Sequence, residues 1–283
     1  MSVILSVEAV FDLYQELGNK VKFLDATFCM PGSHDMRRQI FEQYRLPNAS
    51  FFDIDLIADQ SVELPHMLPT SEVFFGAVAE MGIDEESQVV IYAQEHVAMA
   101  ACRAWWMFHA YGYNNVFVMD GSLRHWMDKG FPLSEIAEVS SPAVAQGQNG
   151  VEPQCVVSLE YLSKNLDDLF VVDARGAERF AGSVAEPRAG LRSGHIPGSH
   201  NLPFVQFFDP YGGFVSGERR EALVKKIFDE AGSRRVVSTC GSGVTACVLA
   251  VVAADSGLGD VSVYDGSWVE YGDEQNNMPI NAD

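Results

Sequence analysis

The chain has 283 residues, of which 47% are hydrophobic and 20% charged, a composition typical of a folded globular protein and not of a disordered or fibrous one. Lys and Arg number 19 against 39 Asp and Glu, which gives a net charge of −20 and argues against nucleic acid or an anionic membrane as a partner. No apolar run reaches the roughly 18 residues of a membrane span, and no basic segment of a secretory signal opens the chain, so we expect a cytoplasmic protein.

One stretch of the sequence is repeated. Residues 89–121 match residues 236–266, with an offset of 147 residues before the intervening helical pattern and 145 after it. A repeat of this length predicts two tandem domains. We place them at 1–135 and 154–283, joined by a linker at 136–153 that is rich in Ser, Ala, Gln and Gly and has no hydrophobic period.

Short apolar runs rich in β-branched residues alternate with helical patterns in both halves. Strands that are apolar on both faces and separated by helices form parallel sheets covered on two sides, so the pattern predicts an α/β fold in each domain, a parallel sheet flanked by helices. In chain order we expect strands at 21–26, 88–93 and 116–119 with helices at 71–81 and around Trp105 and Trp106, then strands at 170–174, 235–239 and 261–264 with helices at 218–231 and 244–254.

The cysteines indicate neither a disulfide framework nor a zinc site, because no Cys-x-x-Cys pair occurs among Cys29, Cys102, Cys155, Cys240 and Cys247. Cys240 differs from the other four, which we interpret as structural, because it opens a turn between an expected strand and an expected helix. The glycines of this turn allow its amides to converge, and the helix adds the positive end of its dipole. Such a turn favours the thiolate, so we predict that Cys240 is a nucleophile held by the amides of Gly241, Ser242, Gly243, Val244 and Thr245.

Three other interpretations use the same turn. Gly241-x-Gly243-x-x-Ala246 fits a dinucleotide fingerprint, with Asp265 where a ribose-binding acid is expected, but the chain lacks the second half of a dinucleotide fold after it. A cysteine phosphatase would need arginine at position 246, where the chain has alanine. A buried structural cysteine stays open as an alternative.

Arginines are concentrated in one short stretch of this acidic protein, and a guanidinium fork binds a carboxylate through two hydrogen bonds. Surface salt bridges with Glu178 and Glu186 are the simpler alternative. We favour a small substrate that bears a carboxylate, because the stretch follows the first core strand of its domain, on the same side of the sheet as the Cys240 turn. The four arginines are Arg175, Arg179, Arg188 and Arg192.

Acidic and histidine residues elsewhere carry weaker signals. In the first domain a carboxylate and an imidazole could transfer a proton, but turn capping explains them equally well; these residues are Asp53, Asp55, Asp59 and His66. We interpret a second set as structural: His34, His195, His200, Trp105, Trp106 and the Asp-Gly pairs at 120 and 265.

The repeat, the Cys240 turn and the segment Gly194-His-Ile-Pro-Gly-Ser-His-Asn-Leu-Pro-Phe204 resemble two-domain rhodanese-type sulfurtransferases over essentially the whole chain. In that family the first domain is similar to a copy that has lost the catalytic cysteine, and here Ala93 stands opposite Cys240. Thiosulfate enzymes typically carry Arg-Lys after the cysteine. The neutral turn of this chain is instead similar to that of the 3-mercaptopyruvate branch.

The resemblance also implies roles for single residues. It implies that Arg179 and Arg188 bind the substrate carboxylate, and that Asp55 and His66 are hydrogen-bond partners of Ser242. The implied reaction moves sulfur from 3-mercaptopyruvate to Cys240 as a persulfide and then to a thiol such as thioredoxin, or to cyanide, with no metal or organic cofactor. A thiosulfate:cyanide sulfurtransferase and a non-catalytic sulfur- or nucleotide-binding module are the alternatives.

Overall fold

The computed structural model describes residues 2–28, 34–84, 86–94, 98–134 and 155–282. The predicted linker at 136–153 and Cys29 lie outside these residues, and the domain boundaries at 135 and 154 stay a prediction. The chain divides into unit 1, which comprises Met1–Gln60, Leu68–Glu152 and Pro210–Phe214, and unit 2, which comprises Ser61–Met67, Pro153–Asp209 and Val215–Asp283.

Unit 1 contains a sheet whose described strands all run parallel, in the order β1-β5-β4-β2-β3. Its strands are β1 (Ile4–Ser6), β2 (Val21–Asp25), β3 (Ser50–Phe51), β4 (Gln88–Ala93) and β5 (Val116–Ser122). Its helices are α1 (Val7–Leu17), η1 (Gly18–Lys20), α2 (His34–Gln43), α3 (Ile54–Ile57), α4 (Ser71–Glu80), α5 (Met99–Ala110) and α6 (Leu123–Asp128).

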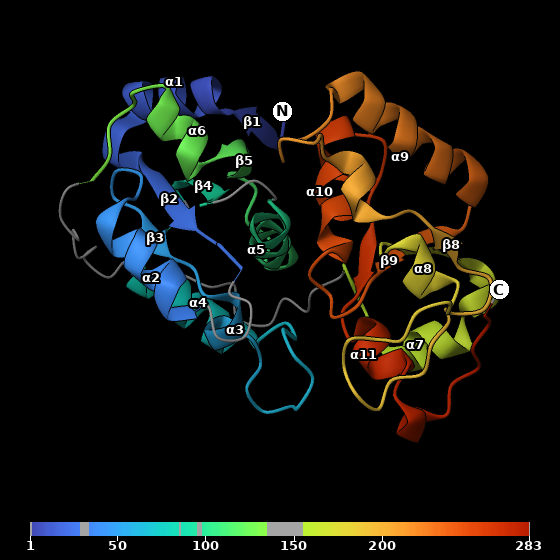
Figure 1. The fold of residues 1–283 in the computed structure, drawn as a ribbon. Coiled ribbons are helices and arrows are strands. Elements are labelled where there is room, and N and C mark those ends of the chain that lie inside the picture. Colours follow the sequence, from blue (N-terminus) through green and yellow to red (C-terminus); the bar gives the residue numbers. More distant parts are fainter. Residues whose placement is uncertain (1, 29–33, 85, 95–97, 135–154, 283) are drawn as a thin grey trace. The chain divides into compact units, whose positions relative to one another are not determined.

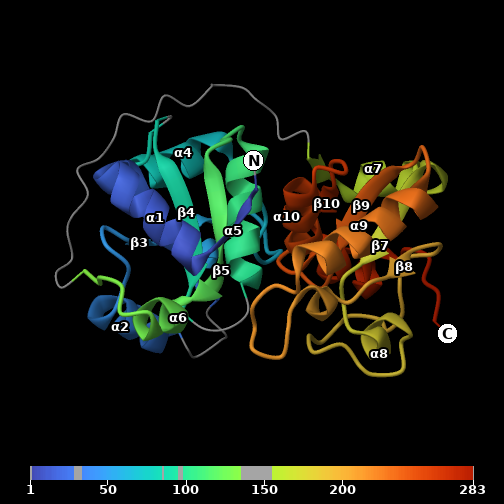
Figure 2. The same cartoon turned by 90° about the horizontal axis from the view of Figure 1, so that it is seen from above.

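Helices cover both faces of this sheet. On one face, Val10 of α1 and Trp126 of α6 pack with Phe23 and Tyr92 of the inner strands in one apolar cluster. On the other face lies α5, which is buried almost along its whole length because it consists largely of Ala, Trp, Met and Phe. Figure 2 shows α1 and α6 on one side of the strands and α5 on the other.

Unit 2 repeats the arrangement, with described strands that all run parallel in the order β6-β10-β9-β7-β8. Its strands are β6 (Val156–Val157), β7 (Leu169–Asp173), β8 (His200–Asn201), β9 (Arg235–Thr239) and β10 (Ser262–Tyr264). Its helices are α7 (Leu159–Lys164), η2 (Leu166–Asp168), α8 (Ala177–Phe180), η3 (Phe204–Phe207), α9 (Gly217–Ala231), α10 (Ala246–Ser256), α11 (Ser267–Tyr271) and η4 (Glu274–Asn276).

The helices of unit 2 also cover both faces of the sheet (Figure 1). Leu162 of α7 and Trp268 of α11 pack on Val171 and Val237 of the central strands, whereas α10, whose residues 246–253 are buried, lies against the opposite face beside α9. The predicted parallel α/β fold is therefore confirmed in both units, and the strand order is the same in both. This order differs from that of a dinucleotide-binding fold, which argues against the dinucleotide interpretation.

Among the residues that the structure describes, no helix combines the length and the apolar character needed to span a membrane.

Candidate active site

Cys240 follows β9 directly, at the carboxyl end of the central strand of the unit 2 sheet, where α/β proteins place their ligand sites. The residue is 2% exposed. Its N–H donates to Oγ of Ser267 over 3.2 Å, and the same hydroxyl lies 4.0 Å from Sγ. The sulfur of Cys240 is therefore buried next to a polar group.

The turn from Cys240 to Thr245 leaves several amides available to a ligand. Gly243 adopts the left-handed conformation (φ +77°), which bends the backbone into α10. Within the described part of the chain, the N–H groups of Gly241, Ser242, Val244 and Thr245 donate to no protein acceptor. Backbone donors of this kind before a helix suit an anion.

The start of α11, which follows the neighbouring strand β10, is hydrogen-bonded to this turn. The N–H of Trp268 donates to the carbonyl of Cys240 over 3.0 Å, and the N–H of Val269 donates to the carbonyl of Gly241 over 2.9 Å. Ser267 is fully buried and has a positive φ of 50°. We did not predict a role for Ser267 from the sequence. The sequence feature that could have indicated it is a serine shortly after the carboxyl end of β10, the strand that pairs with β9.

Arg179 of α8 lies against the Cys240 turn. A Cβ atom at Gly241 would be 3.1 Å from Nη2 and 3.5 Å from Nη1 of Arg179. The adjacent Nε/Nη2 edge of the guanidinium, which shares Nη2 with the edge nearest Gly241, donates to Glu186, from Nε to Oε1 over 3.2 Å and from Nη2 to Oε2 over 2.5 Å. Gly241 is thus needed for a close approach, and Arg179 keeps N–H groups on the edge that faces the turn.

Two of the four arginines are occupied by structural contacts. Arg175 pairs with Asp173 and Glu186 and lies over the ring of Trp268, 4.1 Å from its centroid. Arg192 donates to the carbonyls of Tyr271, Gly272, Asp273 and Met278. Arg188 is exposed, and in the described residues its guanidinium meets no carboxylate. Arg179 and Arg188 are therefore the arginines with donors to offer a ligand.

Unit 1 has neither the cysteine nor the arginine that unit 2 carries at the equivalent ends of its strands. Ala93 ends β4 where Cys240 follows β9, and Thr27 stands where Arg175 pairs with Asp173. Asp25 is buried and accepts from Thr27 Oγ1 (2.5 Å) and Gln94 Nε2 (2.9 Å). Burial raises the pKa of Asp25 to about 6. The candidate site therefore belongs to unit 2.

The predicted set of Asp55, His66 and Ser242 stays a prediction. Asp55 lies in α3 of unit 1, whereas Ser242 belongs to unit 2. His66 is part of the segment Ser61–Met67, which belongs to unit 2, and is buried with a positive φ of 62°. Asp53 caps α3 by accepting from the N–H groups of Asp55 and Leu56, as expected of turn chemistry.

Other residues singled out in the sequence have structural contacts. His195 stacks on Phe180 and its Nδ1 lies 2.8 Å from the carbonyl of the same residue. His200 stacks on Phe170, and Trp105 donates to the carbonyl of Val116. The thiol of Cys247 donates to the carbonyl of Gly243 over 3.2 Å, beneath the Cys240 turn. The side chain of His34 lies outside the described residues.

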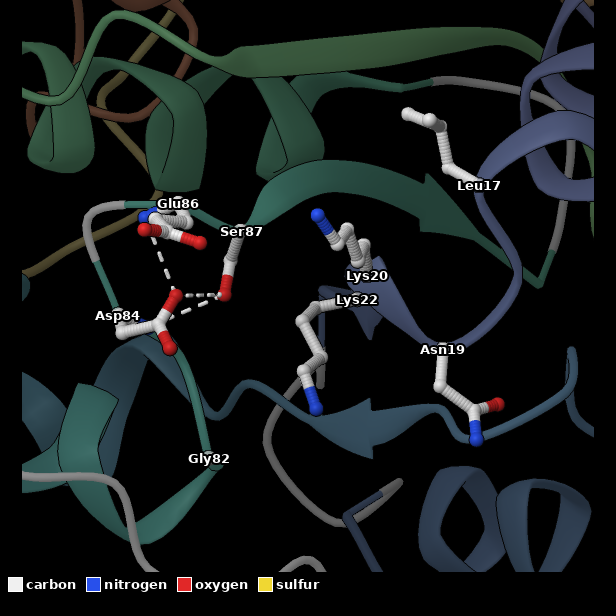
Figure 3. Close-up of a pocket in the computed structure, with 8 residues that line it drawn as sticks. All are labelled: Leu17, Asn19, Lys20, Lys22, Gly82, Asp84, Glu86 and Ser87. Atoms are coloured by element: carbon white, nitrogen blue, oxygen red, sulfur yellow. Dashed lines mark hydrogen bonds between the residues drawn. The ribbon is translucent and has the colours of Figure 1, made fainter.

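A surface pocket of about 360 Å³ lies elsewhere, in unit 1 (Figure 3). It opens at the amino ends of β2 and β4, the end of a parallel sheet at which ligands are not expected. One of its two carboxylates, Asp84, accepts from the hydroxyl of Ser87 and the N–H of Glu86, and together with the charge of Lys22 these bonds lower the pKa of Asp84. Asp84 is therefore already hydrogen-bonded by its neighbours in the pocket.

The chain is similar to known proteins over most of its length. A family model described as the rhodanese-like domain matches residues 12–129 and 158–274. The 3-mercaptopyruvate sulfurtransferase of Mus musculus is 41% identical over 258 residues, covering 89% of this chain and 84% of that protein. The thiosulfate sulfurtransferase of Gallus gallus is 36% identical over 258 residues, covering 90% and 87%. SseA of Escherichia coli, described with the rhodanese fold and mechanism of 3-mercaptopyruvate sulfotransferases, has a TM-score of 0.78 at 28% identity, covering 95% of this chain and 99% of that one.

Proposed function

The chain belongs to the family of rhodanese-like domain proteins, and from that premise we propose that it is a sulfurtransferase whose donor is 3-mercaptopyruvate. The observation that carries the choice of donor is the free edge of Arg179, which faces Gly241 directly after Cys240. A guanidinium edge binds a carboxylate through two parallel hydrogen bonds. A carboxylate on Arg179 would bring a thiol two carbons away from it toward the Cys240 turn.

In the proposed reaction the Cys240 thiolate attacks the sulfur of 3-mercaptopyruvate. A bond forms between the two sulfur atoms while the carbon–sulfur bond breaks, and its electron pair passes to the carbon, which leaves as the enolate of pyruvate and takes up a proton. The outer sulfur stays on Cys240 as a persulfide. The amides of Gly241, Ser242, Val244 and Thr245 would stabilise its negative charge.

An acceptor then removes the outer sulfur. A thiolate, from a small thiol or a thioredoxin, or cyanide attacks the outer sulfur, and the sulfur–sulfur bond breaks to regenerate the Cys240 thiolate. We keep the cytoplasm as the proposed location, although one relative, the thiosulfate/3-mercaptopyruvate sulfurtransferase 1 of Arabidopsis thaliana, is named as mitochondrial and is 37% identical over 93% of this chain.

Mass spectrometry of the purified protein tests the proposal. Treatment with 3-mercaptopyruvate should add one sulfur atom to the Cys240 peptide, cyanide should remove it, and Cys240→Ser should release no pyruvate while it keeps the circular dichroism of the wild type. Pyruvate release by Cys240→Ser would refute the role of this residue.

Thiosulfate is the alternative donor, because thiosulfate sulfurtransferases are nearly as similar to this chain. Comparison of kcat/KM for the two donors on one preparation separates the alternatives. We expect 3-mercaptopyruvate to be the better donor, because no residue between Gly241 and Thr245 carries a positive side chain for a dianion. A higher kcat/KM for thiosulfate would contradict the proposed donor.

A further inference from the structure

Four charged side chains form a chain of ion pairs that ends beside the Cys240 turn. Arg175 Nη2 lies 2.6 Å from Asp173 Oδ2, Arg175 Nη1 lies 2.9 Å from Glu186 Oε1, and Arg179 Nη2 lies 2.5 Å from Glu186 Oε2. The first three side chains are at most 1% exposed, whereas Arg179 is 31% exposed. Only the last member of the chain is therefore open to a ligand.

Glu186 determines how Arg179 is oriented. Both carboxylate oxygens accept from the Nε/Nη2 edge of Arg179, and Oε1 also accepts from Arg175. A guanidinium is planar and has five N–H groups, so fixing one edge also fixes the direction of the other. Arg175 is itself anchored to Asp173 and to the carbonyl of Gly194. The position of Arg179 over Gly241 thus depends on a buried carboxylate with a rigid support.

Glu186 also determines the charge beside the Cys240 turn. Asp173 and Glu186 together cancel Arg175 and Arg179, so the formal charge of the cluster is zero. A carboxylate can still bind the free edge of Arg179, because two parallel hydrogen bonds depend on geometry as well as on charge. A dianion such as thiosulfate gains about twice as much as a monoanion from any excess positive charge, and the cluster offers none.

We propose that Glu186 is a positioning and specificity-determining residue, which orients Arg179 for a carboxylate donor and disfavours doubly charged thiosulfate by cancelling one positive charge beside Cys240. This inference rests on the proposed function.

Glu186→Gln tests the charge, because the variant keeps the length of the side chain and leaves the cluster with one excess positive charge. In a Cys240→Ser background, which cannot turn over, calorimetric titration gives the Kd of pyruvate, a monoanionic carboxylate, and of thiosulfate. We expect Glu186→Gln to shift the ratio of the two Kd values by about 10-fold toward thiosulfate, the order of effect that one unit charge has at a partly exposed site. Glu186→Asp keeps the charge and should leave the ratio within about 2-fold of wild type.

Turnover of Glu186→Asp with Cys240 intact tests whether Glu186 positions Arg179. The aspartate of Glu186→Asp is one methylene too short to hold both nitrogens of Arg179, so we expect kcat with 3-mercaptopyruvate to fall by about 10-fold while the Kd ratio does not change. A merely structural role would not produce this separation of the two readouts. Because the test of positioning needs only this variant, it holds even if Glu186→Gln does not fold.

Glu178→Gln is the matched control, because Glu178 lies on α8 next to Arg179 but is exposed. It should change neither readout, and a shift equal to that of Glu186→Gln would overturn the proposal. An unchanged Kd ratio in folded Glu186→Gln, or an unchanged kcat in Glu186→Asp, would also overturn it. Failure of the wild type to load sulfur on Cys240 would instead defeat the proposed function, and the Kd ratio would still report on Glu186.

Discussion

Gly241 is the residue at which Arg179 meets the Cys240 turn. In Gly241→Ala the new methyl group would lie 3.1 Å from Nη2 of Arg179, so the guanidinium must move away from the turn. We expect the KM for 3-mercaptopyruvate to rise by about 10-fold, because a small displacement of a group that positions substrate has a large kinetic effect. Steady-state kinetics of pyruvate release measures this change.

Gly217→Ala is the control for Gly241→Ala, because its methyl group would also meet an arginine, Arg220, but at an ordinary distance of 3.9 Å from Nη2. We expect Gly217→Ala to leave KM unchanged. Equal KM values for Gly241→Ala and the wild type would mean that Arg179 does not bind the donor.

Arg188 provides the second test at the scale of single residues. It is exposed and has no carboxylate partner among the described residues, so Arg188→Ala should not disturb the fold. If Arg188 binds the donor carboxylate, the loss of a charged hydrogen bond should raise the KM for 3-mercaptopyruvate by about 10- to 100-fold. The KM for thiosulfate should change much less.

The comparison for Arg188→Ala is Arg219→Ala, which removes an exposed arginine of α9 from the same unit. Both variants should be measured with both donors. Equal changes with 3-mercaptopyruvate and thiosulfate would show that Arg188 contributes only general positive charge.

The sequence predicted those features of the candidate site that depend on neighbouring residues. Cys240 and its turn could be identified because the glycines and the following helix are contiguous with it, and the roles of Arg179 and Arg188 came from the family resemblance. The ion pairs of Glu186 with the arginines are the alternative that the sequence offered, but the burial of Glu186 could not be predicted, since its contact with Arg175 spans 11 residues that include α8. Ser267 lies 27 residues from Cys240, and only the pairing of β9 with β10 brings the two together.

At the scale of elements, the ends of β2 and β7 show how the repeat has diverged. Asp173 ends β7 and pairs with Arg175, whereas Asp25 ends β2, forms no ion pair within the part of the chain that the structure describes, and has its pKa raised from 3.8 to about 6 by burial. Between pH 3.8 and about pH 6 the folded unit therefore binds more protons at Asp25 than the unfolded chain does. The stabilising contribution of protonated Asp25 is therefore complete below about pH 4 and is lost as the pH rises through 6.

Asp25→Asn should remove this dependence on pH. A shift of about two pKa units corresponds to about 3 kcal/mol. The wild type should therefore lose about 2 kcal/mol of unfolding free energy relative to the variant when the pH is raised from 4 to 8. Urea denaturation followed by pulsed hydrogen exchange on β2 peptides reports on unit 1 alone. A difference between variant and wild type that is constant with pH would show that Asp25 does not titrate in this range.

The inner strands could be predicted from the sequence and the edge strands could not. For β4 and β9 the predicted bounds equal those in the structure, because each strand has a Val-Val pair and is buried on both faces from its second residue onward. The edge strands β1, β3, β6 and β8 have only two or three residues. Runs this short show no periodicity, and their pairing depends on the neighbouring strand.

At the scale of the whole molecule, the net charge of −20 opposes the approach of an anionic donor. 3-Mercaptopyruvate carries one negative charge from its carboxylate, and thiosulfate carries two. Salt shortens the reach of this repulsion, since the Debye length falls from about 30 Å at 0.01 M to about 10 Å at 0.1 M. Arg179 would act on a bound carboxylate at contact distance, where screening is much weaker.

Raising the KCl concentration from 0.01 to 0.1 M should therefore increase kcat/KM for 3-mercaptopyruvate by about 2- to 5-fold. A plot of log kcat/KM against the logarithm of the KCl concentration should be about twice as steep for thiosulfate as for 3-mercaptopyruvate, because the interaction of a dianion with the net charge of the protein is doubled. The rate at which an uncharged phosphine, such as tris(3-hydroxypropyl)phosphine, removes the outer sulfur from loaded Cys240 provides the uncharged control and should not change, because a phosphine attacks without first losing a proton. A kcat/KM that falls with salt for both donors would mean that the arginines beside the Cys240 turn, and not the acidic surface, govern how anions reach the sulfur.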